Sequence, residues 1–334
     1  MSKRVRTLDS FFSPPPLKRP KAAQNVTGEE QRDEHGDTKG VSAAYSRHAT
    51  YPFSITHLPM ELREILNFVP AAEARAINDQ PELDLLSFTP FIPKAAQVEL
   101  FEFLRAELPF YRVKYTIKRG PVETVINTPR FTTVFGVDDT ARFRDGQLTH
   151  AISGSPLAKD SYKCCPRPLP QCLDVLRELT ENATGCRFNF ALVNYYATGS
   201  DSISYHSDDE RFLGADPAIA SFTLGQARDF LLKHKPTPMN HTSETKPTKM
   251  PLGPGDMLLM RGKTQSNWLH SIPKRQGKDA HKGRINITFR RALIRAGTEN
   301  YYRYNVGDGI AYRWSASKRE MVPDSAMSSS STEV

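Results

Sequence analysis

Two histidines and one aspartate are the residues whose types and spacing best fit metal chemistry in this chain. His206 and Asp208 stand two positions apart in ISYHSDDERF, and His270 follows the apolar run DMLLM. Side chains two positions apart leave the same face of a β-strand, so we expect His206 and Asp208 to share a strand and reach one ion. Two imidazoles and one carboxylate form the ligand set of non-haem Fe(II) oxygenases. Zinc takes the same ligand types, and His270 alone also fits a hydrogen-bonded core histidine.

A second group of polar residues lies in RINITFR, residues 284–290. As a strand, this segment would present apolar residues on one face and polar residues on the other. The polar face consists of Arg284, Asn286, Thr288 and Arg290. Two arginines that face a cavity need anions to offset the cost of burial, and a dicarboxylate would pair with both guanidinium groups. An edge strand with its arginines in water is the alternative interpretation.

The elements that position these residues are predicted to be helices followed by short strands. Apolar residues at three- and four-residue spacing predict helices over MELREILNF and PKAAQVELFEFLRAELPF, and a later one over PQCLDVLRELTENATG that ends at Gly185. From Tyr111 onward, at least eight short segments are β-branched or aromatic and are separated mostly by Gly, Pro and Asp. This order predicts an α+β fold: an antiparallel double-sheet barrel or jelly roll flanked by helices.

The chain is expected to form one folded domain between two disordered tails. Residues 1–50 and 323–334 are rich in polar, charged or proline residues, which cannot bury enough apolar surface to order the chain. The domain is assigned to residues 51–322, with a helical flank over about 51–110 and a β core over about 111–322. The four cysteines form no CxxC pair and are expected to be reduced thiols without a metal role.

The composition favours an intracellular protein with nucleic acid or another acidic partner, and a generic basic soluble protein is the alternative. No apolar run is long enough to cross a bilayer, and the N-terminus lacks the apolar stretch of a secretory signal. The formal net charge of +8 favours nucleic acid or another acidic partner, although it carries no information about the fold.

Three segments together closely resemble the AlkB family of Fe(II) and 2-oxoglutarate dependent dioxygenases. They are NYYATGSDSISYHSDDE from Asn194 to Glu210, His270, and RINITFR, and the resemblance extends from about Pro129 to Ala292. The eukaryotic DNA-repair members are the most similar. The resemblance implies a double-stranded β-helix, or jelly-roll, core and an enzyme that uses Fe(II), 2-oxoglutarate and molecular oxygen. Such enzymes decarboxylate 2-oxoglutarate to succinate and hydroxylate an N-alkyl carbon, which is then lost as an aldehyde.

The resemblance also assigns roles within the site. His206, Asp208 and His270 would hold iron. Arg284 and Arg290 would pair with the two carboxylates of 2-oxoglutarate. The hydrogen bonds to this cosubstrate would come from Asn194, Tyr196, Asn286 and Thr288.

The implied substrate is alkylated DNA, single- or double-stranded, carrying bases of the 1-methyladenine and 3-methylcytosine type. The alkylated atom lies on the pairing edge, so the base must leave the stack and enter the pocket. His206 would form one wall of this pocket, and we assign the other to Tyr162. Arg130 is expected near the substrate. Asp209 and Glu210 would accept hydrogen bonds from an exocyclic amine, with a solvated acidic turn as the alternative.

A predicted hairpin, YTIKRGPVETVINTPR, bears on the form of the substrate. Its tip, Lys118 to Glu123, combines basic residues with Pro121 and Val122. By resemblance it would hold phosphates and insert apolar groups into a duplex, and an ordinary solvated hairpin is the alternative.

The N-terminal tail contains two short signals. VRTLDSFF resembles the peptide that binds the DNA sliding clamp, through Leu8, Phe11 and Phe12, although Val5 replaces the expected glutamine. PLKRPKAA is a basic cluster of the nuclear-import type. We therefore expect a nuclear, monomeric DNA-repair demethylase without membrane association. The alternatives are an RNA or tRNA demethylase with the same site, and a catalytically silent nucleic-acid or sliding-clamp adaptor.

Overall fold

The computed structural model describes residues 45–119, 122–158, 160–236, 246–277, 280–295 and 309–324. The predicted tail features, Leu8, Phe11, Phe12 and the basic cluster, lie outside the described residues. Part of the segment expected to be a tail is a strand, because β1 (Tyr45–Ser46) pairs with β2 (Ile55–Thr56). None of the described helices is long and apolar enough to span a membrane.

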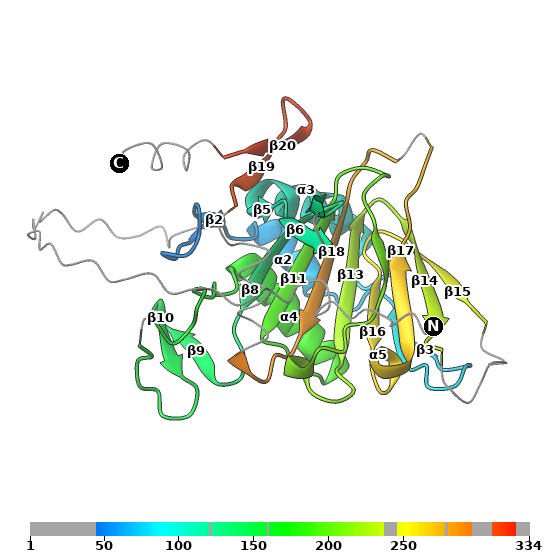
Figure 1. Ribbon diagram of the computed structural model, residues 1–334, viewed down its shortest axis with the longest axis horizontal. Coiled ribbons are helices and arrows are strands. Elements are labelled where there is room, and N and C mark those ends of the chain that lie inside the picture. The colour runs from blue at the N-terminus through cyan, green and yellow to red at the C-terminus, as the bar shows by residue number, and fades with distance from the viewer. Residues whose placement is uncertain are drawn as a thin grey trace, which may run out of the picture.

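Two antiparallel sheets form the body of the molecule (Figure 1). The main sheet has ten strands, and their order across the sheet is β20 (Glu320–Pro323), β19 (Ala311–Ser315), β5 (Phe110–Tyr111), β8 (Phe131–Gly136), β11 (Phe190–Tyr196), β18 (Arg284–Arg290), β13 (Ile219–Gly225), β16 (Met257–Met260), β4 (Leu85–Phe88) and β3 (Arg75–Ile77). The smaller sheet has the order β12 (Ile203–His206), β17 (Trp268–Ile272), β14 (Arg228–His234) and β15 (Thr248–Leu252). This double-sheet arrangement confirms the predicted jelly-roll core.

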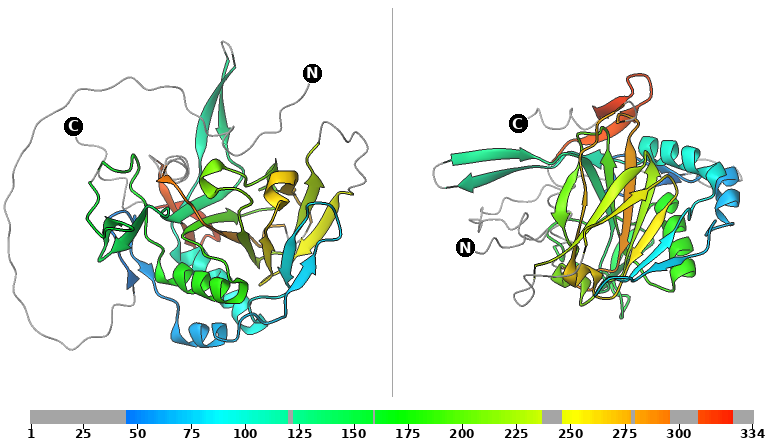
Figure 2. Two further views of the ribbon diagram at one scale, coloured as in Figure 1. Left: turned by 90° about the horizontal axis from the view of Figure 1, so that it is seen from below. Right: turned by 90° about the vertical axis from the view of Figure 1, so that its right-hand side faces the viewer.

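Helices cover one side of the main sheet, as the two views of Figure 2 show. They are α2 (Met60–Leu66), α3 (Lys94–Glu107) and α4 (Gln171–Thr184). Leu62, Leu100 and Leu173, one from each helix, belong to the apolar cluster that also contains Ile287 and Phe222 of the main sheet. α4 ends where the sequence predicts, because Gly185 adopts a φ of +69° that side chains disfavour.

A second apolar cluster lies between the two sheets. It contains Leu192 and Tyr196 of the main sheet together with Phe230, Trp268 and Ile272 of the smaller sheet. The neighbouring residues of β11, such as Val193, belong instead to the cluster on the helix side. The alternation along each strand therefore sends every second side chain into the space between the sheets.

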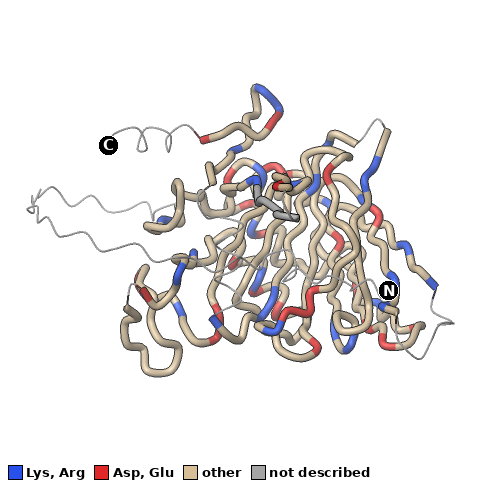
Figure 3. Tube along the Cα trace, in the orientation of Figure 1, with Lys and Arg blue, Asp and Glu red and all other residues tan. Residues whose placement is uncertain are grey.

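The two remaining hairpins project from this body. β6 (Lys114–Arg119) pairs with β7 (Val122–Asn127), and β9 (Ala141–Arg144) pairs with β10 (Gln147–His150). Figure 2 shows the teal β6–β7 hairpin standing well away from the sheets. Lys and Arg alternate with Asp and Glu along the trace (Figure 3), so net charge alone does not locate a nucleic-acid surface.

Two expectations about the elements are corrected by the structure. The segment assigned to a helical flank also supplies β3 and β4 to the edge of the main sheet. The strand that carries His206 ends at that residue, so Asp208 follows the strand instead of lying on it. The backbone N–H of Asp208 donates to the Gln265 side chain, which replaces a strand partner.

Candidate active site

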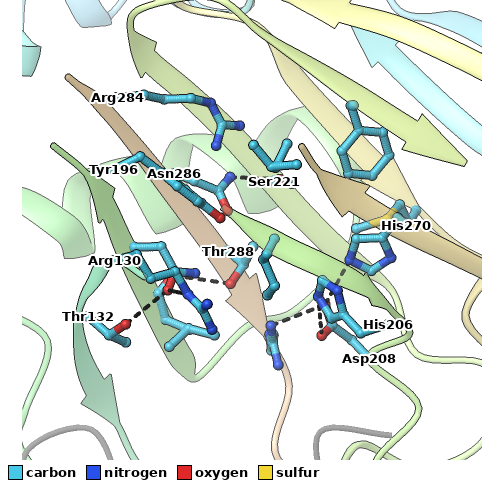
Figure 4. Close-up of a pocket in the computed structure, with 17 residues that line it drawn as sticks. Arg130, Thr132, Tyr196, His206, Asp208, Ser221, His270, Arg284, Asn286 and Thr288 are labelled. Atoms are coloured by element: carbon cyan, nitrogen blue, oxygen red, sulfur yellow. Dashed lines mark hydrogen bonds and ion pairs between the residues drawn. The ribbon is translucent and has the colours of Figure 1, made fainter. Parts of the chain in front are cut away.

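Strand pairing brings the two histidines together. His206, the last residue of β12, is the cross-strand partner of His270 in β17, and their ring centroids are 4.2 Å apart. The Nε2 atom of each histidine lies 3.8 Å from a carboxylate oxygen of Asp208. One ligand atom from each of the three residues lies within 4.8 Å of the others, as Figure 4 shows in close-up. The predicted ligand set therefore converges.

The protonation of these residues suits a divalent metal. Burial lowers the pKa of His270 to about 3 and also lowers the pKa of His206, so both imidazoles are neutral near pH 7. Burial opposes the charge on Asp208, but Arg290 and the two histidines outweigh it and lower the pKa of Asp208. The His206 Nδ1–H donates to the Ser204 carbonyl at 2.9 Å, which leaves Nε2 as the ligand atom.

One oxygen of the Asp208 carboxylate could bind a cation. Its Oδ1 is buried and has no hydrogen-bond partner among the described residues. A buried acceptor of this kind is costly unless it is satisfied by a donor or an ion. Neutral imidazoles, an anionic carboxylate and an unsatisfied oxygen together fit Fe(II) bound by two histidines and one aspartate.

β18 lies at the centre of the main sheet, between β11 and β13, which rules out the edge-strand interpretation. Its apolar residues Ile285, Ile287 and Phe289 belong to the cluster on the helix side. Its polar residues all line the cavity that contains the three candidate metal ligands, and they are Arg284, Asn286, Thr288 and Arg290. The predicted separation of the two faces is confirmed.

Arg284 offers free donors inside this cavity. Its side chain is 1% exposed, and its Nη2 donates to the Thr223 hydroxyl at 2.8 Å. Nε and Nη1 have no hydrogen-bond partner among the described residues. Burial lowers the pKa of Arg284 to about 10, so the guanidinium remains charged near pH 7. A buried, charged fork with open donors fits a carboxylate.

Arg290 connects the strand to the metal ligands. Its Nη2 lies 3.1 Å from Asp208 Oδ2, and its Nη1 lies 3.9 Å from Glu210 Oε1. Both side chains of the shorter pair are 2% exposed, so this ion pair is shielded from water. The two arginines of β18 therefore differ: Arg290 pairs with Asp208, whereas Arg284 forms no ion pair or hydrogen bond with His206, Asp208 or His270 among the described residues.

The amide and hydroxyl side chains of the cavity wall hold neighbouring strands together. Asn286 Nδ2 donates to the Ser221 hydroxyl at 2.9 Å and to the Phe222 carbonyl at 2.7 Å. Thr288 donates to the Leu192 carbonyl at 3.1 Å. Tyr196 also lines the cavity, and its ring centroid is 5.3 Å from the guanidinium carbon of Arg284.

The side chain of Asn194, on β11, is held by two residues that lie on the side of this strand that pairs with β8. Its Oδ1 accepts from Arg130 Nε at 3.0 Å and from the Thr132 hydroxyl at 3.1 Å. Arg130 and Thr132 both line the cavity. The sequence predicted Arg130 and Asn194 separately, but it did not indicate Thr132 or their shared contact.

The remaining predicted substrate-binding residues are Glu210, Asp209 and Tyr162, and the structure places them in different surroundings. Glu210 is 1% exposed and lies beside Arg290. Asp209 forms an ion pair with Lys235 at 2.7 Å. The structure does not bring Tyr162 into the cavity: its hydroxyl donates to Asp138 at 2.7 Å, within a separate apolar cluster. Phe230 stacks instead against His270, with ring centroids 5.3 Å apart.

Comparison with known proteins agrees with this geometry. The family model described as "2OG-Fe(II) oxygenase superfamily" matches residues 84–290. The human "DNA oxidative demethylase ALKBH2" is 33% identical over 214 residues, which cover 62% of this chain and 73% of that protein. The Arabidopsis thaliana protein of the same name is 32% identical over 63% of this chain and 67% of its own length.

Another relative, of a different name, is similar over a shorter part of the chain. The human "Alpha-ketoglutarate-dependent dioxygenase alkB homolog 3" is 41% identical over 158 residues, which cover 46% of this chain and 54% of that protein. The family uses Fe(II), 2-oxoglutarate and molecular oxygen, and the ligand set described above fits this requirement. This chain belongs to the 2OG-Fe(II) oxygenase superfamily and, within it, to the AlkB family of dioxygenases.

Proposed function

We propose that this protein is a DNA-repair enzyme that oxidatively demethylates N-alkylated bases of the 1-methyladenine and 3-methylcytosine type. One observation carries the proposal: a buried His206, Asp208 and His270 set shares its cavity with the polar face of β18. The names of the relatives above support the choice of DNA as substrate.

Different residues of the site would bind the metal and the two carboxylates of 2-oxoglutarate. His206, Asp208 and His270 would hold Fe(II), which supplies oxidation of the N-alkyl carbon when 2-oxoglutarate and oxygen are bound. Arg284 would bind one carboxylate of 2-oxoglutarate through its open donors. Arg290 keeps Asp208 ionised and oriented toward the ligand site, and it would hold the other carboxylate.

Burial of the charged groups in the site also contributes to the proposed reaction. The side chains of Arg284, Arg290 and Asp208 are each at most 2% exposed. Such a site excludes bulk water, which strengthens the charge interactions and limits side reactions.

The substrate contacts are proposed from position and charge. Glu210 follows the candidate metal ligands, and its Oε1 lies 3.9 Å from Arg290 Nη1, a looser pair than that of Asp209, so we take Glu210 as the acceptor for an exocyclic amine. Asp209 is already paired with Lys235. Arg130 lines the cavity and would approach the substrate from the bend just before β8.

The β6–β7 hairpin supports recognition of a duplex. Val122 and Val125 on β7 are 59% and 62% exposed, which is unusual for valines in a strand. Apolar side chains on a projecting element can enter a base step when the target base leaves the stack.

Succinate release tests the proposed function. We would compare iron-loaded protein on a DNA oligonucleotide with 1-methyladenine, the matched RNA, and unmodified DNA. Methylated DNA should stimulate release most strongly. A stronger response to RNA would assign the site to RNA demethylation. No stimulation by any oligonucleotide, with 2-oxoglutarate bound, would favour a catalytically silent adaptor.

We further propose that the protein is nuclear and monomeric and binds the sliding clamp through Leu8, Phe11 and Phe12. These proposals rest on the sequence of the N-terminal tail and on the DNA-repair function. Size-exclusion chromatography with light scattering tests the monomer, and a dimer peak would contradict it.

A further inference from the structure

The loop that carries Asp208 has no regular secondary structure to hold it. β12 ends at His206, and the next residues follow without strand pairing. A metal ligand in such a loop needs other bonds to keep its carboxylate in place.

Gln265 supplies the first of these bonds. Its Oε1 accepts from the backbone N–H of Asp208 at 2.9 Å. Gln265 is 1% exposed and lies in the short helix α5 (Thr264–Asn267), which leads directly into β17 and His270. The bond therefore joins the two segments that carry metal ligands. A flipped amide would place a donor against the Asp208 N–H, so the oxygen must face the loop.

Lys235 supplies the second connection. Its Nζ donates to Asp209 Oδ2 at 2.7 Å and to the backbone carbonyl of Gln265 at 2.9 Å. Its backbone N–H donates to the Asn267 carbonyl at 2.7 Å, which fixes the end of β14 against α5. The Lys235 and Asp209 side chains are 17% and 24% exposed, so water screens their ion pair only in part.

These bonds form a closed ring through Asp208, Asp209, Lys235 and Gln265. Two successive residues of the loop are linked to α5: Asp208 directly, through its backbone N–H and the Gln265 side chain, and Asp209 indirectly, through Lys235. The other contacts of the Gln265 side chain are weak, since Nε2 meets only the Met260 sulfur at 3.2 Å among the described residues. Burying an amide costs free energy unless it is hydrogen-bonded, and the bond from the Asp208 N–H is the contact that offsets this cost.

We propose that Gln265 is a positioning residue for the metal site and that Lys235 supports it by fixing both α5 and Asp209. Asp209, through its ion pair with Lys235, then helps to hold its neighbour Asp208 in place. The inference rests on the iron site of the proposed function, but it concerns metal affinity and not the choice of substrate.

Metal binding tests the inference directly. Mn(II) titration followed by electron paramagnetic resonance would measure affinity in the full-length protein without oxygen chemistry. Gln265→Met keeps the length of the side chain and removes the acceptor, so the Mn(II) dissociation constant should rise about 10-fold to 100-fold. Gln265→Glu retains an acceptor oxygen and should stay close to the parent. Lys235→Met should weaken binding about 10-fold, toward the lower end of the same range.

The controls separate positioning from general damage. Gln147→Met changes an exposed glutamine on β10 and should leave Mn(II) binding unchanged. The 2-oxoglutarate affinity at saturating Mn(II) should be preserved in the Gln265 variants, because β18 is untouched. Melting curves identify variants that fail to fold, and Lys235→Met then provides the decisive comparison.

Failure of this inference can be distinguished from failure of the proposed function. Gln265→Met or Lys235→Met protein that is folded and binds Mn(II) within about twofold of the parent would overturn the inference. Equal weakening by Gln265→Glu and Gln265→Met would also overturn it, since the acceptor would then be irrelevant. If the parent binds Mn(II) but demethylates nothing, the proposed function fails while the positioning role can still be measured.

Discussion

Replacing Arg284 with methionine separates binding of 2-oxoglutarate from binding of the metal. The guanidinium is buried and charged, its Nη2 donates to Thr223, and its Nε and Nη1 have no hydrogen-bond partner among the described residues, so both can bind a carboxylate. Each hydrogen bond to a charged group contributes about 1.5–3 kcal/mol. Two such bonds to one carboxylate share part of their energy, and we expect a loss of about 3 kcal/mol, or about 150-fold in the dissociation constant.

The assay is an anaerobic titration of Mn(II)-loaded protein with 2-oxoglutarate. Mn(II) affinity of Arg284→Met should equal that of the parent, because Arg284 forms no ion pair or hydrogen bond with the three ligands among the described residues. Arg290→Met is the matched control, and it should weaken both ligands because Arg290 Nη2 is 3.1 Å from Asp208 Oδ2. The reasoning is refuted if Arg284→Met binds 2-oxoglutarate within about threefold of the parent, or loses Mn(II) as Arg290→Met does.

Three further predictions concern the substrate, the fold and the tail. Val122→Asp places a charge on the exposed hairpin and should lower turnover on duplex DNA more than on a single strand, measured with the same modified base; equal losses would contradict a role in opening the duplex. Tyr162→Phe removes the hydroxyl that donates to the Asp138 carboxylate and should destabilise the fold by about 1–3 kcal/mol in urea unfolding, with turnover unchanged. A selective rise in the KM for DNA would instead place Tyr162 at the base. Replacing Phe11 and Phe12 with alanine should cost about 2 kcal/mol or more in binding to a purified sliding clamp, and undiminished binding would show the motif to be accidental.

Residue type and periodicity were sufficient to predict the polar face of β18. Arginine, asparagine and threonine alternate there with isoleucine and phenylalanine, which predicts two different faces, but only the pairing of β18 with β11 and β13 shows that the polar face does not belong to an edge strand. The metal ligands were likewise predicted from chemistry. Their convergence depends on the pairing of β12 with β17, which no local pattern specifies.

The supports of the site were not predictable from the sequence. Asp208 and Gln265 are 57 positions apart, and neither shows a periodic signal that relates it to the other. The choice of Tyr162 as a pocket wall was based on residue type within a loop region, where spacing gives no direction for a side chain. One missed element did carry a signal: the Asp145-Gly146 turn between β9 and β10 has φ values of +51° and +71°, as expected of a tight hairpin.

The stoichiometry of repair tests the central claim most directly. Iron-loaded protein, 2-oxoglutarate and an oligonucleotide with one 1-methyladenine would be analysed for restored adenine, formaldehyde and succinate, in the parent and in Asp208→Ala. The parent should form adenine and formaldehyde in equal amounts, with at least one succinate each, and Asp208→Ala should form none because only two protein ligands remain. Repair that needs no 2-oxoglutarate, or that survives loss of the Asp208 carboxylate, would contradict the account.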